Sequence, residues 1–89
     1  MRRVFKYELL MCDHINIILP KGAEILKVGV QSDQPFMWTL IDPDAPDEKR
    51  SFRIVGTGHS IDEINLKFID TFQLSGGDLI FHIFEILGD

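Results

Sequence analysis

The fold of this chain is decided by residues 75–87, which read SGGDLIFHIFEIL. The first four residues are typical of a tight turn, because glycine adopts positive φ angles without steric cost. The nine residues that follow are apolar on both alternating faces, and His82 interrupts them. An extended segment of this composition is typical of a strand in the middle of a sheet, covered on both sides. We therefore expect residues 79–87 to form a central strand.

Upstream of this segment, apolar residues fall in short runs with period two, bounded by Gly, Pro, Asp and Asn. This spacing predicts strands, and no ten-residue window has good helical spacing. The other expected strands cover about residues 4–10, 15–19, 23–31, 36–41, 50–55 and 66–74. The segments 23–31 and 36–41 form the clearest hairpin. The predicted fold is all-β: a small antiparallel sandwich or barrel of about seven strands, with one short helical turn.

Length and composition indicate one compact, soluble domain over residues 1–89, because 45% of residues are hydrophobic and 26% are charged. The formal net charge of −5 repels phosphate backbones, which argues against general nucleic-acid binding. Cys12, the single cysteine, cannot form an internal disulfide, and residues 1–8 contain no apolar signal-peptide core. We expect a cytoplasmic protein that does not bind membranes.

The least ordinary segment begins with Gly56-Thr57-Gly58. It does not match the Walker phosphate loop. It does not match the dinucleotide fingerprint either, since Ile61 stands where that fingerprint needs a third small residue. Ser60 and Glu63 have the spacing of a capping box, so a single helical turn starting at Ser60 is one interpretation. The alternative is that the glycines only permit a sharp exit from a strand.

An anion is the ligand that such a turn would hold, because consecutive backbone N–H groups and the positive end of a capped turn attract negative charge. A histidine within an apolar strand is a candidate for the polar floor of a pocket, or for a satisfied structural residue. The candidate ligand contacts are Arg53, Gly56, Thr57, Gly58, His59, Ser60 and His82.

Catalytic and metal-binding patterns are not legible. His14, His59 and His82 share no metal-ligand spacing, and Cys12 lies too close to His14 in sequence for a thiol–imidazole pair. No Gly-x-Ser-x-Gly elbow is present. Residues 42–48 combine two prolines with four acids, which predicts an exposed, stiff loop. We therefore expect no enzyme activity, no cofactor and no bound metal.

Several segments together resemble a small family of uncharacterised proteins encoded by phages and by prophage regions of bacterial genomes. These segments are FRIVGTGH (52–59), FIDTFQL (68–74), GG (76–77), FHIFE (81–85), LPKGAEIL (19–26) and WTLIDPD (38–44). The resemblance covers nearly the whole chain, and it implies no particular activity or catalytic residue. By analogy, small acidic phage proteins often act by binding a host protein or a small signalling molecule of antiviral defence.

These observations predict a non-catalytic binding protein of the phage or prophage type that works in the host cytosol. An anti-defence role is one interpretation of such binding. Its partner is either a host protein that contacts the acidic segment 42–48 or a small anionic signalling ligand at residues 56–60. The paired apolar faces of residues 36–41 and 79–87 also predict a homo-oligomer. The alternatives are a structural protein of the virion and a small hydrolase.

Overall fold

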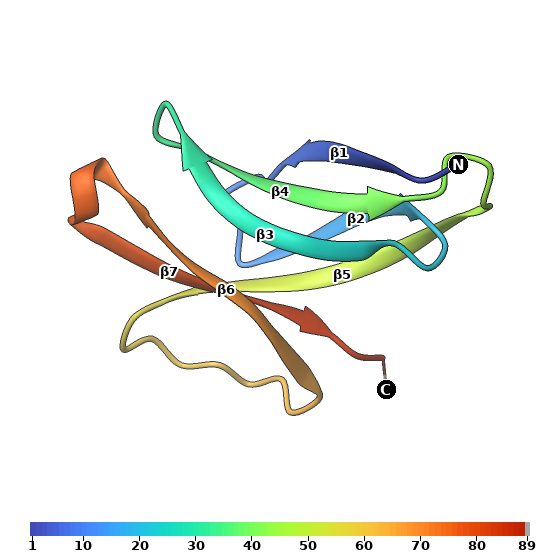
Figure 1. Cartoon of the computed structure of the whole chain (residues 1–89). Coiled ribbons are helices and arrows are strands. Elements are labelled where there is room, and N and C mark those ends of the chain that lie inside the picture. The colour runs from blue at the N-terminus through green and yellow to red at the C-terminus, as the bar shows by residue number, and fades with distance from the viewer. Residues whose placement is uncertain (89) are drawn as a thin grey trace.

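The computed structural model describes residues 1–88 and confirms the all-β prediction (Figure 1). The strands are β1 (Arg3–Glu8), β2 (His14–Pro20), β3 (Glu24–Gln31), β4 (Gln34–Ile41), β5 (Asp47–Gly56), β6 (Leu66–Leu74) and β7 (Leu79–Ile86). A single 3-10 turn, η1 (Ser75–Gly77), joins β6 to β7. Strand β5 begins earlier than the sequence predicts, so the acidic loop before it is shorter and Asp47 and Glu48 belong to the strand.

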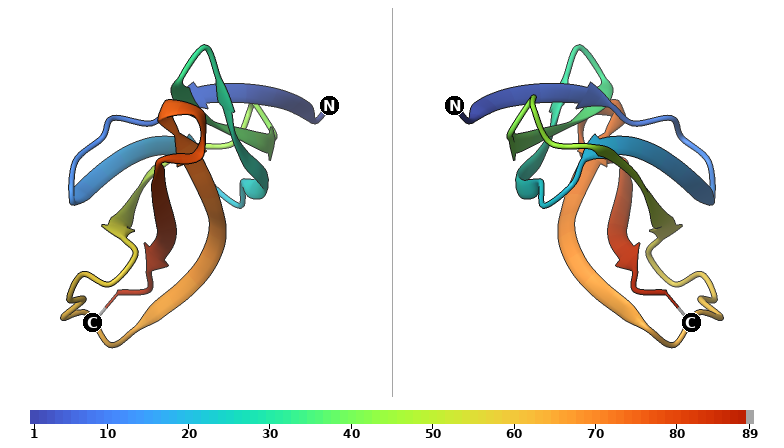
Figure 2. Two further views of the ribbon diagram at one scale, coloured as in Figure 1. Left: turned by 90° about the vertical axis from the view of Figure 1, so that its left-hand side faces the viewer. Right: turned by 90° about the vertical axis from the view of Figure 1, so that its right-hand side faces the viewer.

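The strands form two antiparallel sheets that pack as a sandwich (Figures 1 and 2). The three-stranded sheet has the order β1-β4-β3, and the four-stranded sheet has the order β2-β5-β7-β6. The sheets meet where β3 lies near β6, because the Val28 N–H donates a hydrogen bond to Asp70 Oδ2 at 3.1 Å. Strands β1 and β2 are the edges of the two sheets on the opposite side.

One layer of apolar side chains fills the space between the sheets. Phe52 and Ile83 from the four-stranded sheet and Met37 from the three-stranded sheet are each 0% exposed. Inside the same layer, the rings of Phe72 and Phe81 stack with their centroids 5.8 Å apart. The molecule is thin, with principal extents of 39 × 33 × 16 Å. The core is therefore a single sheet-to-sheet contact with no further layer.

The predicted hairpin of β3 and β4 is confirmed, and its turn residues explain its geometry. Ser32 and Asp33 have positive φ angles of 51° and 59°. Two successive positive φ angles are the signature of the tight turn that matches the twist of paired strands. The Asp33 carboxylate also accepts a hydrogen bond from the Ser75 N–H at 2.6 Å. The hairpin tip and η1 are thus tied together at one end of the sandwich.

The prediction for residues 79–87 is correct in one respect and wrong in another. Strand β7 lies between β5 and β6, as a central strand should. Its outward face is not covered, because the sandwich has only two layers: Ile80 is exposed, and Phe84 is half-buried. Only Ile83 and Glu85 of this strand are buried. Apolar residues on both faces therefore do not mean burial on both faces here.

A buried hydroxyl gives a test of the core. Thr39 is 0% exposed, and its Oγ1 has no hydrogen-bond partner within residues 1–88. Because a buried polar group without a partner costs free energy, Thr39→Val should raise the free energy of unfolding by about 1 kcal/mol. Urea unfolding measures this change. The matched control is Thr71→Val, which removes a hydroxyl bonded to His82 and should give no gain. A Thr39→Val protein less stable than wild type would contradict the prediction.

Candidate functional site

The candidate site begins at the turn that follows β5, at one end of the sandwich. Gly58 has a φ of +85°, a conformation that glycine adopts readily. The His59 N–H donates to the Gly56 carbonyl at 3.1 Å, which closes the turn. The imidazole of His59 then lies against Gly56, where an added Cβ would be 3.3 Å from two ring atoms. Both glycines are therefore explained by the local structure of the turn.

The helical turn suggested at Ser60 does not form, and the one helical turn within residues 1–88 is η1 instead. The reason is that Glu63 has stronger partners than the backbone N–H that a capping box would offer. Its Oε1 accepts a hydrogen bond from Arg53 Nε at 3.1 Å, and its Oε2 lies 2.5 Å from His14 Nε2. Glu63 therefore joins β2 and β5 to the segment that crosses their outward face.

Arg53 is used to hold this segment in place. Besides Glu63, its guanidinium donates to the carbonyls of Ile54 at 2.7 Å and Ser60 at 3.2 Å. Its side chain is only 11% exposed. The hydrogen bond with His14, aided by Arg53, holds the pKa of Glu63 below its ordinary value. Arg53 was expected to contact a ligand, and the structure gives it internal partners.

His82 lies on the outward face of the four-stranded sheet, between two threonines. Its Nε2 is 2.8 Å from Thr57 Oγ1, and its Nδ1 is 2.9 Å from Thr71 Oγ1. A hydroxyl can either donate or accept, so both nitrogens of a neutral imidazole are satisfied by this arrangement. His82 thereby connects the turn after β5 to β6, across β7. This corresponds to the structural interpretation of a histidine in an apolar strand.

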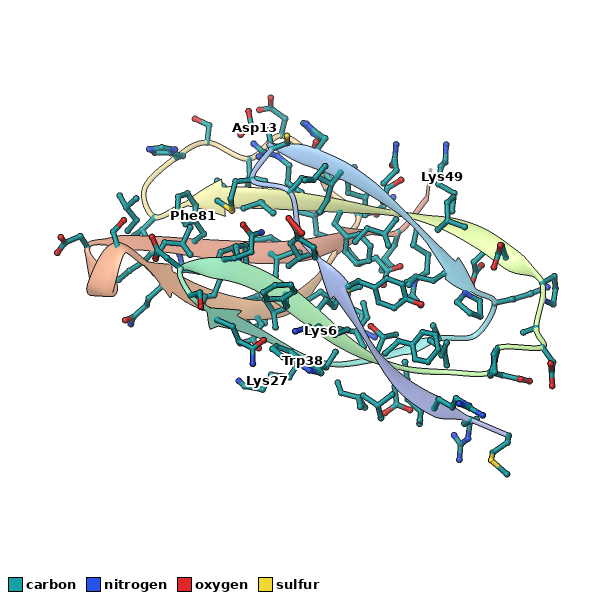
Figure 3. All side chains as sticks on the ribbon, turned by 90° about the horizontal axis from the view of Figure 1, so that it is seen from above. Lys6, Asp13, Lys27, Trp38, Lys49 and Phe81 are labelled. Atoms are coloured by element: carbon teal, nitrogen blue, oxygen red, sulfur yellow. The ribbon has the colours of Figure 1, made fainter. Side chains whose placement is uncertain are left out.

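Two hollows of about 300 and 310 Å³ share His59, Gly56 and Phe81 as walls. Figure 3 labels Phe81 and Asp13, which belong to this part of the molecule. The first hollow is also lined by Thr57, Asp78, Leu79 and Ile80, and the second by Met11, Cys12, Asp13 and Ile54. Each hollow thus has one carboxylate, and no lysine or arginine of residues 1–88 lines either. The lining does not favour an anion.

The sequence-predicted contacts are therefore only partly brought together. Gly56, Thr57 and His59 line the hollows, whereas Arg53, Gly58, Ser60 and His82 do not.

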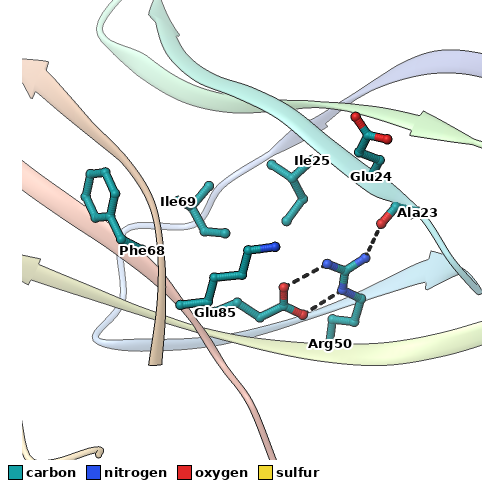
Figure 4. A pocket seen from close by; sticks show the side chains of 8 residues that line it. Ala23, Glu24, Ile25, Arg50, Phe68, Ile69 and Glu85 are labelled. Atoms are coloured by element: carbon teal, nitrogen blue, oxygen red, sulfur yellow. Dashed lines mark hydrogen bonds and ion pairs between the residues drawn. The ribbon is translucent and has the colours of Figure 1, made fainter. Parts of the chain in front are cut away.

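A third cavity, which sequence reasoning missed, lies between the sheets and has a volume of about 260 Å³ (Figure 4). At its wall, Arg50 donates two hydrogen bonds of 2.7 Å to the Glu85 carboxylate and one of 2.5 Å to the Ala23 carbonyl. The hydrogen bond with Glu85 raises the pKa of Arg50. Since both carboxylate oxygens accept from Arg50, this pair stabilises the fold. The sequence signal that could have revealed this ion pair was Glu85, a charged residue within an apolar strand.

The outward face of the four-stranded sheet carries a cluster of apolar side chains. Phe68 lies opposite Phe84, and Leu66 lies opposite Ile86, in the register of β6 and β7. The two phenyl rings meet edge to face, with centroids 5.6 Å apart. Phe68 is 56% exposed. We call these four residues the Phe68 cluster, and sequence reasoning missed it because period-two spacing does not tell which faces are covered.

Within the described part of the chain, no three His, Cys, Asp or Glu side chains are placed to hold a metal ion. None of the helical structure in that part is long and apolar enough to cross a membrane.

The fold and these surfaces define a small β-sandwich domain with an exposed apolar face. The chain belongs to the DUF7352 family, a domain of unknown function, whose model matches residues 1–87. No curated protein and no solved structure matches the chain.

The contact of Glu63 with Arg53 and His14 predicts a pH dependence. Because folding lowers the pKa of Glu63, its stabilising contribution is complete above the ordinary value of 4.5 and is lost as the pH falls through the folded-state pKa. Backbone NMR relaxation should show residues 57–65 ordered at pH 7 and mobile near pH 3. Glu63→Gln should make them mobile at pH 7 already, whereas Asp62→Asn, at the exposed neighbouring acid, should not. Equal order in Glu63→Gln and wild type would disprove this role.

Proposed function

We propose that this chain is a non-catalytic binding protein that holds a protein partner against the outward face of its four-stranded sheet. The observation that carries the proposal is the Phe68 cluster. Phe68 is exposed and Leu66, Phe84 and Ile86 are half-buried, so the cluster is a contiguous apolar surface in contact with water. Surfaces of this kind mark interaction sites in small proteins. The cluster is built on two paired strands, so its side chains are held in a fixed arrangement before a partner binds.

A neighbouring residue extends this apolar surface. Ile64, which precedes β6, is 92% exposed and lines one hollow together with Ile86 of the cluster. With the Phe68 cluster it forms a surface long enough for several side chains of a partner. Large aromatic residues are also the type that contributes most to binding at protein interfaces.

The charge of the chain favours a basic partner. Its formal net charge is −5, and Asp42 and Asp44 are exposed in the loop between β4 and β5. The Asp42 carboxylate accepts a hydrogen bond from the Asp44 N–H at 3.0 Å, which fixes the loop. Acidic surface of this kind accelerates the encounter with a basic protein. A host protein of basic character fits both this charge and the resemblance to phage-encoded proteins.

A small anionic signalling ligand is the second candidate, and it would bind in the two hollows beside His59, although each of them contains one carboxylate and is lined by no lysine or arginine of residues 1–88. His59 is the residue on which this candidate depends, because Arg53 and His82 have partners inside the protein. Calorimetric titration with mononucleotides and cyclic dinucleotides tests it against a His59→Ala variant. Equal binding by the variant, or no binding by wild type, rejects this candidate.

The protein-binding proposal predicts that Phe68→Ser abolishes capture of the partner. The matched control is Ile18→Ser on β2 at the far edge of the same sheet, because Phe68 and Ile18 are both 56% exposed. Immobilised wild type and Ile18→Ser should retain the same stoichiometric protein from an extract of the native cell. Phe68→Ser should bind that protein, once purified, at least tenfold more weakly, by surface plasmon resonance. Its thermal unfolding should stay close to that of Ile18→Ser.

Two results would reject the proposal. One is a partner that Phe68→Ser binds as tightly as wild type does, and the other is the absence of any partner that distinguishes the two variants.

A further inference from the structure

We propose that two copies of this chain associate through β1, pairing antiparallel to form a six-stranded sheet with Phe5 on the two-fold axis. The surface involved is the free edge of the three-stranded sheet, at the periphery of the molecule (Figure 2). It does not overlap the Phe68 cluster, which lies on the other sheet. This inference is therefore independent of the proposed function.

The backbone groups of β1 alternate between pointing toward β4 and pointing away from the sheet. Leu9, just after the strand, donates its N–H to the Pro35 carbonyl of β4 at 3.0 Å. In an antiparallel pair, alternate residues bond to the same neighbour, so Tyr7, Phe5 and Arg3 also point their backbone groups toward β4. The N–H and C=O groups of Val4 and Lys6 therefore point away from the sheet. An edge of this kind is a template for another strand.

No side chain of β1 blocks this edge. Proteins commonly protect an edge strand with a lysine, and Lys6 is in the middle of β1. Its Nζ instead lies 4.5 Å from the Phe36 ring centroid and donates to Gln31 Oε1 at 3.1 Å. Lys6 is thus drawn across the sheet toward Trp38, as Figure 3 shows. Meanwhile Val4 is 54% exposed and Phe5 is 43% exposed.

The charges on β1 select one register for the pairing of the two copies. Outward-pointing backbone groups belong to even-numbered residues, so the two-fold axis must pass through a residue of β1, and Val4, Phe5 and Lys6 are the central choices. An axis at Val4 would set Arg2 opposite Lys6 of the partner subunit. An axis at Lys6 would set that lysine opposite Lys6 of the partner subunit. Like charges directly opposite one another are destabilising.

An axis at Phe5 removes both conflicts. Arg2 then faces Glu8 of the partner subunit, and Val4 faces Lys6 of the partner subunit. On the opposite face, Arg3 lies across from Tyr7 of the partner subunit, a cation–aromatic pair. The two Phe5 rings form a pair without hydrogen bonds between their backbones, the closer type of pair in an antiparallel sheet. Side chains that are exposed in the monomer are thereby covered.

A charge swap tests the register. Glu8→Lys should raise the dissociation constant of the dimer about tenfold, because it sets two positive charges opposite each other twice per dimer. Adding Arg2→Glu should return the constant to within about threefold of wild type. Glu24→Lys is the control, since it makes the same change of charge on β3, at the far edge of this sheet. Sedimentation equilibrium at low salt measures all four proteins.

A second variant tests the backbone pairing. Val4→Pro removes one outward N–H and leaves the hydrogen bonds with β4 in place, and proline is tolerated on edge strands. We expect a monomer with the circular dichroism spectrum of wild type.

A wild type that sediments only as the 10.2 kDa chain at high micromolar concentration would overturn the proposal. So would a Val4→Pro dimer of wild-type affinity, or no recovery in the charge swap. A monomeric wild type that still binds the Phe68-dependent partner refutes only this inference and leaves the proposed function standing.

Discussion

The pairing of β5 with β7 is the interaction on which the rest of this structure depends. It places Phe52, Ile54 and Ile83, all at most 3% exposed, in adjoining positions on the inward face of the four-stranded sheet. Burying these side chains requires one opposing surface, which the three-stranded sheet supplies. All seven strands within residues 1–88 belong to these two sheets, so no further strand is left to cover the outward face of β6 and β7. The exposure of the Phe68 cluster is thus a direct consequence of how a short chain builds its core.

Two arginines of β5 hold together parts of the chain that the apolar layer alone does not connect. Arg50 points inward and joins Glu85 on β7 to the Ala23 carbonyl before β3, so it links the two sheets. Arg53 is three residues further and points outward, where with Glu63 it holds the segment between β5 and β6. A buried charge is tolerated only when it is paired and hydrogen-bonded, and Arg50 meets that condition.

The strands could be predicted from sequence because period-two alternation reflects the geometry of a strand itself. The hairpin at Ser32 and Asp33 and the central place of β7 followed from the same local patterns. The candidate site could not be predicted, because the hydrogen-bond partners of its side chains lie far away in the sequence. Arg53 meets Glu63 only after ten residues have folded back, and Arg50 meets Glu85 across thirty-five. The capping box at Ser60 failed for the same reason, since Glu63 takes charged partners instead.

The arrangement of the two proposed surfaces has its own consequence. Strand β1 is the edge of the three-stranded sheet, whereas the Phe68 cluster faces outward from the four-stranded sheet. Association through β1 therefore leaves that cluster uncovered in both copies. A dimer presents two such surfaces related by a two-fold axis, and a partner that is itself dimeric can engage both at once. Since the second contact is then intramolecular, a weak interaction at each cluster yields tight overall binding. A domain with one thin core can thus bind strongly without a deep pocket.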